Sequence, residues 1–180
     1  FTGGLVGYFS YDYIKYAEPN LKLKNEENAD FQDVDLMLFD TLIVFDSYKQ
    51  KLILIAGVST QDPEHSYEEA KKHLEDMKTL LRSDARAIER PLQLITPLTP
   101  AHSKAAYGKM VETAKHHIYE GDIFQVVLSN PLTAKATGSL FDVYRVLRTV
   151  NPSPYMFYFC SDTFEMAGAS PETLAKLQNG

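Results

Sequence analysis

The sequence predicts an α+β fold, and three observations lead to that class. Runs of strand-forming residues follow one another closely, and strands that are near neighbours in sequence usually pair antiparallel. The helical patterns do not alternate regularly with these runs, which argues against a doubly wound parallel sheet. The 180 residues are 44% hydrophobic and 23% charged, without a low-complexity tract, as in globular proteins.

The first predicted elements are a strand and a short helix. Residues 5–10 are apolar and aromatic, and they follow a glycine pair, Gly3-Gly4. This pair and Gly7 indicate that the backbone of a neighbouring strand comes close. A short helix is then expected over 13–17, with Asp12 as its cap.

A hairpin and a long helix come next in the prediction. Residues 22–30 are polar and predict an exposed loop. The runs 34–45 and 51–58 are rich in Leu, Ile, Val and Phe and predict an antiparallel hairpin. A capping box over 66–69 then begins an amphipathic helix, whose apolar residues recur at helical spacing over 67–81.

The proline-containing stretch 82–102 has no apolar period and predicts an extended linker. We therefore expect residues 1–180 to form one incomplete domain, with a first segment over 1–81 and a second over 103–180. The chain begins without methionine and stops directly after a strand-like run, so we expect it to be a piece of a longer protein. In the second segment, the pattern predicts a helix over 103–120, which ends at Gly121, and another over 140–149. Strands are predicted over 123–129, 155–160, 163–169 and 173–177.

Composition excludes several classes of function. The net charge is −6 and no segment gathers a basic stripe, which argues against nucleic-acid binding. The apolar runs are interrupted by charges before they reach the length of a membrane span. The single cysteine, Cys160, cannot form an internal disulfide and fits a reducing, cytoplasmic location. The scattered histidines predict no metal site, and Asp33 is interpreted as part of a solvated sheet face.

Two segments carry candidate functional residues. Gln125 is a neutral amide in an otherwise apolar strand, so its buried side chain would need partners from a polar network or a ligand. Glu172 follows a proline turn and precedes an apolar run, where burial would raise the pKa of its carboxyl towards that of a general acid. A capped turn or a salt-bridged glutamate would give the same sequence, so both alternatives stay open.

Four motifs resemble those of the chorismate-utilising enzymes, in the branch of anthranilate synthase component I. They lie in the family's order at residues 3–12, 120–129, 151–156 and 168–172. The resemblance covers the whole chain as the middle of a longer polypeptide. It implies a partial antiparallel β-sandwich with flanking helices, within the α+β class.

The resemblance also implies a reaction in which chorismate and ammonia give anthranilate and pyruvate. Mg²⁺ would hold the substrate, through glutamates that lie beyond position 180, and a glutamine amidotransferase partner would supply the ammonia. Glu172 corresponds to the glutamate that protonates the departing C4 hydroxyl. That role agrees with chemistry, because hydroxide leaves poorly unless a neutral acid protonates it.

Gln125 distinguishes amination from hydration within this family. Relatives that add water to chorismate have a lysine at this position, because water must lose a proton as it attacks. Neutral ammonia needs no such activation, so the amide of Gln125 fits an amine nucleophile.

One further motif resembles the tryptophan feedback pocket of anthranilate synthases. An aromatic ring and a thioether are suitable walls for an indole, and we expect them to be remote from the acid. The alternative for this motif is that its residues are strand core. For the enzyme as a whole, the alternative is aminodeoxychorismate synthase component I. The third possibility is a non-catalytic module that binds tryptophan or docks a partner. We expect the chain alone to have no anthranilate synthase activity. The motif consists of Asn151, Pro152, Ser153, Pro154, Tyr155 and Met156.

Overall fold

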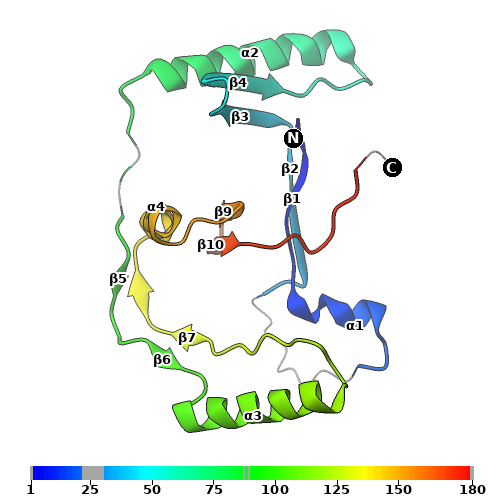
Figure 1. Cartoon of the computed structure of the whole chain (residues 1–180). Helices are drawn as coiled ribbons and strands as arrows, with labels where there is room; N and C mark the ends of the chain where they lie inside the picture. The colour runs from blue at the N-terminus through cyan, green and yellow to red at the C-terminus, as the bar shows by residue number, and fades with distance from the viewer. Residues whose placement is uncertain (1, 22–30, 87, 89, 179–180) are drawn as a thin grey trace. The chain divides into compact units, whose positions relative to one another are not determined.

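A computed structural model of the chain describes residues 2–21, 31–86, 88 and 90–178 (Figure 1). The chain divides into two units, residues 1–87 and 88–180. Helices and antiparallel strand pairs occur in both units, which confirms the predicted α+β class. The strands of the described residues form separate two-stranded sheets, so the finer expectation of a β-sandwich is not confirmed.

In the first unit, strand β1 (Gly4–Phe9) pairs antiparallel with β2 (Val34–Phe39). Gly7 lies opposite Leu36, and a Cβ atom on Gly7 would come within 1.9 Å of the backbone oxygen of Asp35. Any side chain would therefore push the two strands apart. The predicted close approach of backbones at this glycine is confirmed.

The predicted hairpin is present, but its first run is divided into two strands. Strand β3 (Thr41–Asp46) pairs antiparallel with β4 (Lys51–Ala56), whereas β2 pairs with β1. The change of partner occurs at Asp40, whose backbone oxygen accepts a hydrogen bond of 2.7 Å from the Gly57 N–H. Because β1 begins at the residue opposite Phe39, the chain must take a new partner there.

The short helix begins differently from the prediction. A single 3₁₀ turn, η1 (Tyr11–Tyr13), leads into α1 (Ile14–Ala17), and no side chain caps either element. The expected cap by Asp12 is therefore wrong. The predicted loop at 22–30 lies outside the described residues.

Asp33 fastens this helical turn to the start of β2. Its carboxylate accepts hydrogen bonds from the hydroxyls of Ser10 (3.0 Å) and Tyr16 (2.8 Å) and pairs with the Lys15 ammonium. The Lys15 ammonium and then the two hydroxyls hold the pKa of Asp33 below its usual value. Because Asp33 precedes β2 and is held by these partners, its interpretation as part of a solvated sheet face is wrong.

The long helix α2 (Pro63–Arg82) starts earlier than the capping box indicates. Asp62 is the cap and accepts a hydrogen bond of 3.3 Å from the His65 N–H, with proline at the first helical position. Ser66 instead donates its hydroxyl to the Asp62 backbone oxygen. The helix packs on β4 with Ala70 buried, as the apolar stripe predicts.

In the second unit, the predicted linker is partly structured. Its latter half pairs with residues 131–139 as a ribbon of two short antiparallel ladders. Gly138 has a φ of 96°, and a Cβ there would lie 2.3 Å from the Pro91 backbone oxygen, so this crossing requires glycine. The ladders pair β5 (Gln93–Leu94) with β8 (Ala136–Thr137), and β6 (Thr99–Pro100) with β7 (Leu132–Thr133).

Helix α3 (Lys104–Glu120) has the predicted ends. Ser103 accepts a hydrogen bond of 3.2 Å from the Ala106 N–H, and Gly121 ends the helix in the left-handed conformation with a φ of 83°. The strand predicted over 123–129 is not formed. This segment has no strand partner among the described residues.

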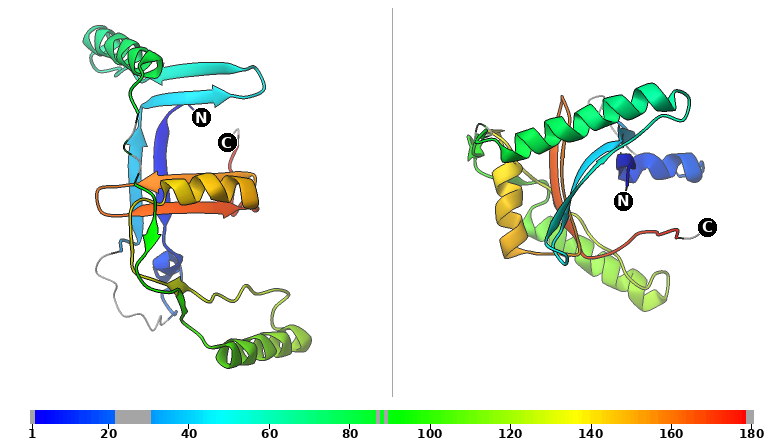
Figure 2. Two further views of the ribbon diagram at one scale, coloured as in Figure 1. Left: turned by 90° about the vertical axis from the view of Figure 1, so that its left-hand side faces the viewer. Right: turned by 90° about the horizontal axis from the view of Figure 1, so that it is seen from above.

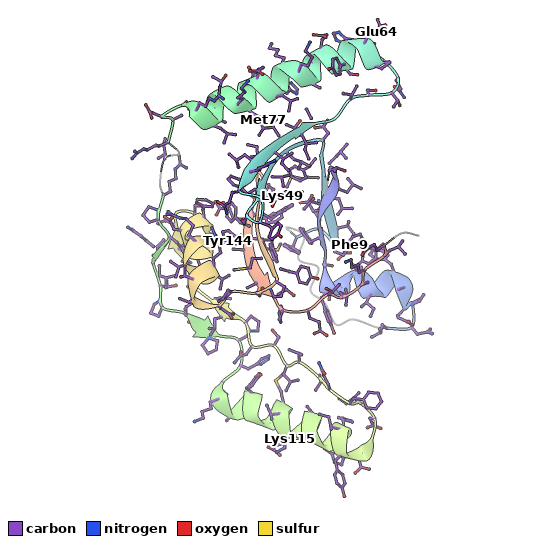
Figure 3. All side chains as sticks on the ribbon, turned by 45° about the horizontal axis from the view of Figure 1, so that its top comes forward. Phe9, Lys49, Glu64, Met77, Lys115 and Tyr144 are labelled. Atoms are coloured by element: carbon purple, nitrogen blue, oxygen red, sulfur yellow. The ribbon has the colours of Figure 1, made fainter. Side chains whose placement is uncertain are left out.

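The last elements form a helix packed on a hairpin. Helix α4 (Phe141–Val150) lies along the antiparallel pair of β9 (Tyr155–Cys160) and β10 (Glu165–Ser170) (Figure 2). Tyr144, which Figure 3 labels on α4, has its ring centroid 6.1 Å from that of Tyr158 in β9. The helix and the hairpin confirm the prediction, whereas the strand expected over 173–177 is not formed.

Candidate functional site

Glu172 lies in the turn that follows β10. The Ser170 hydroxyl donates a hydrogen bond of 3.1 Å to the Glu172 backbone oxygen and closes the turn. The Glu172 side chain is exposed, so the burial expected from the sequence is wrong for this chain. Residues 173–178 form no element that could cover the carboxyl group.

The structure brings the Pro-rich segment 151–156 into contact with this turn. In the β9–β10 register Tyr155 lies opposite Ser170. The Ser153 hydroxyl lies within donating distance, 2.9 Å, of the backbone oxygens of both residues. The Thr173 hydroxyl donates to the Tyr155 hydroxyl. Because Thr173 follows Glu172 directly, the expectation of remoteness from the acid is wrong for the Tyr155 side chain.

The exposure of segment 151–156 bears on the core-packing alternative. Asn151 ends α4, and its N–H donates to the Leu147 backbone oxygen at 2.9 Å. Tyr155 is 49% exposed, but Ala70 is the only buried residue among those described, so this exposure is compatible with both alternatives. Met156 is half-buried and is compatible with either a pocket wall or strand packing. Pro152 and Pro154 are exposed and Ser153 is half-buried.

Gln125 lies in the extended segment that follows α3, and its side chain is exposed. The buried network expected around this amide is therefore absent from the described part of the chain. No hydrogen bond or ion pair between described residues joins Gln125 to Glu172. The structure thus does not bring these two candidates together.

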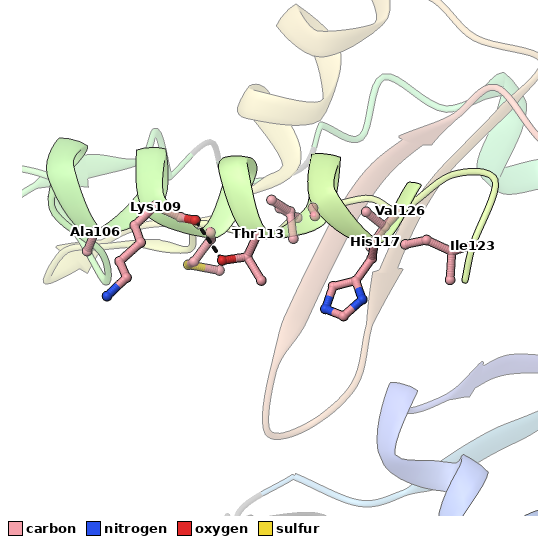
Figure 4. A pocket seen from close by; sticks show the side chains of 9 residues that line it. Ala106, Lys109, Thr113, His117, Ile123 and Val126 are labelled. Atoms are coloured by element: carbon pink, nitrogen blue, oxygen red, sulfur yellow. Dashed lines mark hydrogen bonds between the residues drawn. The ribbon is translucent and has the colours of Figure 1, made fainter. Parts of the chain in front are cut away.

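Helix α3 and the segment that follows it form the walls of an open apolar hollow of about 550 Å³ (Figure 4). The Tyr107 hydroxyl holds this segment against the helix through the Leu128 backbone oxygen, at 3.1 Å. Gln125 does not line the hollow. The hollow is lined by Ala106, Lys109, Met110, Thr113, Ala114, His117, Ile123, Val126 and Leu128.

Glu165 is a polar residue whose role the sequence analysis missed. Its carboxylate accepts hydrogen bonds from the Ser139 hydroxyl (2.9 Å) and the Leu140 backbone N–H at the start of α4. The Leu140 N–H lowers the pKa of Glu165, and the Ser139 hydroxyl adds to this effect against the opposing effect of burial. A lone acid in the otherwise uncharged β10 was the available sequence signal.

Neither a metal centre nor a membrane span emerges from the described residues. No three His, Cys, Asp or Glu side chains of residues 2–21, 31–86, 88 and 90–178 lie together as ion ligands. These residues do not by themselves form a site for the expected Mg²⁺. The described helices are also too short or too polar to cross a bilayer.

Comparison with known proteins places these motifs in one family. The family model for chorismate binding enzymes matches residues 2–180. Anthranilate synthase component 1 from Acinetobacter calcoaceticus is 36% identical over the whole chain, and the protein of that name from Saccharomyces cerevisiae is 36% identical over 97% of it. The chain spans 37% and 36% of these two relatives.

A solved structure agrees with the sequence comparison. The crystal structure of anthranilate synthase component I from Streptococcus pneumoniae TIGR4 superposes on the whole chain with a TM-score of 0.79 at 32% identity. The match covers 41% of that structure's chain. The chain described here therefore belongs to the family of chorismate binding enzymes.

Proposed function

We propose that this chain is part of an anthranilate synthase component I and provides the acid side of its active site. The complete enzyme converts chorismate and ammonia to anthranilate and pyruvate. The observation that carries the proposal is the position of Glu172, accessible on a closed turn after β10, in a chain that matches the family throughout. The names of the relatives support the anthranilate branch over aminodeoxychorismate synthase.

In this proposal Glu172 donates a proton to the C4 hydroxyl of chorismate as that group leaves. Only the neutral carboxylic acid can do this, so the carboxyl must be protonated when the substrate is bound. Gln125 has no basic group, which suits neutral ammonia as the nucleophile, because ammonia needs no base to activate it.

The cofactor and partners follow from the same family assignment. Mg²⁺ would supply charge neutralisation for the substrate carboxylates, with ligands outside the described residues. A glutamine amidotransferase subunit would supply ammonia in a cytoplasmic enzyme, and tryptophan would bind against segment 151–156. The types of side chain at Tyr155 and Met156 support this inhibitor site, because an aromatic ring and a thioether are suitable walls for an indole.

The test is Glu172→Gln in the complete enzyme, assayed with ammonia and Mg²⁺ for anthranilate fluorescence and pyruvate release. We expect kcat to fall by roughly 10² to 10⁴, because the amide keeps the shape but has no acidic proton. Glu68→Gln, at an exposed ion pair of α2, is the matched control and should leave kcat unchanged. A kcat within threefold of the parent would make Glu172 structural. Consumption of chorismate without release of anthranilate and pyruvate would exclude the proposed reaction and favour aminodeoxychorismate synthase.

A further inference from the structure

We propose that Tyr155 and Thr173 form a link that positions the turn bearing Glu172. Tyr155 is then a positioning residue for the acid. This inference rests on the proposed function, in which Glu172 is the proton donor. It concerns contacts within the second unit alone, between the start of β9 and the turn after β10.

The link restrains the turn from both sides of Glu172. On the preceding side, Ser170 is paired with Tyr155 in the sheet and shares the Ser153 hydroxyl with it. On the following side, the Thr173 hydroxyl donates to the Tyr155 hydroxyl. Only Pro171 and Glu172 lie between these two anchors, and the proline ring fixes the φ angle of its own residue. The backbone of Glu172 therefore has little freedom while both anchors hold.

An acid restrained in this way needs less reorganisation to reach the leaving hydroxyl. Proton transfer requires the donor within hydrogen-bond distance of the leaving oxygen, so small displacements of the turn reduce the rate. The Thr173 anchor is a single hydrogen bond between exposed side chains, and its contribution is correspondingly modest. We expect its loss to lower kcat about three- to tenfold, far less than loss of the carboxyl itself.

The test uses four variants of the complete enzyme with saturating ammonia. Thr173→Val removes the donor and keeps the shape, Tyr155→Phe removes the acceptor, and the double variant removes both. Thr173→Ser restores a hydroxyl and is the rescue variant. Thr163→Val is the matched control, because Thr163 lies in the loop at the opposite end of the β9–β10 hairpin, and its hydrogen bonds to described residues are local ones with Ser161.

We expect both single variants to lower kcat to the same extent, with KM for chorismate within twofold of the parent. The double variant should equal either single one, because both remove the same link. Thr173→Ser and Thr163→Val should keep the parental kcat. In a Glu172→Gln background, Thr173→Val should have no further effect on kcat, since there is no acid left to position.

Each other outcome overturns the inference in a recognisable way. Additive losses in the double variant would show that the two hydroxyls act separately. An unchanged kcat in Thr173→Val, with Glu172→Gln still inactive, would contradict the role of the link but not the proposed function. An active Glu172→Gln enzyme would remove the proposed function and the link together. Thermal melts of every variant distinguish these results from unfolding, because a folded variant keeps the parental transition.

Discussion

At the scale of single residues, Tyr155 and Met156 differ in how their replacement should affect catalysis and tryptophan binding. Tyr155 contacts the turn of Glu172 through Thr173, so its replacement affects chemistry as well as any inhibitor site. Met156 lies opposite Ala169 within the sheet, and no side-chain bond of the described residues ties it to the turn. Met156 is therefore the better probe of tryptophan binding.

We predict that Met156→Ala in the complete enzyme raises the tryptophan concentration needed for inhibition by about five- to 150-fold. Loss of one apolar wall costs roughly 1 to 3 kcal/mol of ligand binding, whereas kcat should stay near the parental value. Inhibition curves measured beside thermal melts check this result. Unchanged tryptophan sensitivity in a folded variant would contradict the pocket, and joint loss of activity and stability would favour strand packing.

The residues that the sequence located correctly have local partners. Ser103 caps a group three residues away, and Gly121 ends the helix that precedes it, so local spacing is enough to predict both. Glu165 meets the Leu140 N–H 25 positions away, and no local pattern identifies such a pair. Gln125 and Glu172 were located as candidates from local sequence, but their exposure depends on what packs over them, which spacing does not encode.

At the scale of elements, helix α4 has no side-chain cap from its own N-terminal residue, and Glu165 of β10 takes that role. Leu140 at the start of the helix makes no side-chain cap of its own, and its N–H is satisfied by β10 instead. The Ser139 hydroxyl bonds the same carboxylate and accepts from the Phe141 N–H at 3.1 Å. The carboxylate thus fastens α4 to the hairpin that carries Tyr155 and the turn of Glu172.

We predict that Glu165→Gln destabilises the complete enzyme by about 1 kcal/mol at pH 7, because the amide oxygen can still accept the two hydrogen bonds but lacks the charge that strengthens them. Its folded pKa is lowered, so the carboxylate's stabilisation is fully present above the unfolded value of about 4.3 and disappears as pH falls through the folded value. Thermal melts from pH 7 down to 3 should therefore show the parent and the variant converging. Glu112→Gln, at an exposed ion pair of α3, should melt like the parent, and a constant gap for Glu165→Gln at all pH values would contradict the assignment.

The segments 123–129 and 173–177 show why apolar composition alone does not predict a strand. Their apolar residues predict strands, yet a strand forms only where a second backbone satisfies its N–H and C=O groups. Phe124 and Leu174 are fully exposed, and neither segment has a strand partner among the described residues.

At the scale of the whole molecule, the exposed surface is unusually large. The accessible area is 15834 Å² for 20.3 kDa, against about 8,800 Å² for one folded domain of that mass and about 10,600 Å² for two separate halves. The excess therefore does not depend on how the two units are placed. Among the described residues only Ala70 is buried, at 6% exposure. Such a chain needs further polypeptide to cover its apolar faces.

We predict that the isolated 180-residue chain lacks a cooperative thermal transition, binds a hydrophobic dye and turns over no chorismate with ammonia and Mg²⁺. Folding must offset a conformational entropy cost of roughly 1 to 2 kcal/mol for each residue, and this needs far more burial than the described residues show. The complete enzyme, assayed in parallel, should melt sharply and produce anthranilate. Tryptophan titration of the isolated chain tests the non-catalytic module, because a stable binding module would show a raised melting temperature with tryptophan. A sharp melt with tryptophan stabilisation would contradict this prediction and favour the module, whereas turnover by the isolated chain would place the complete active site within these 180 residues.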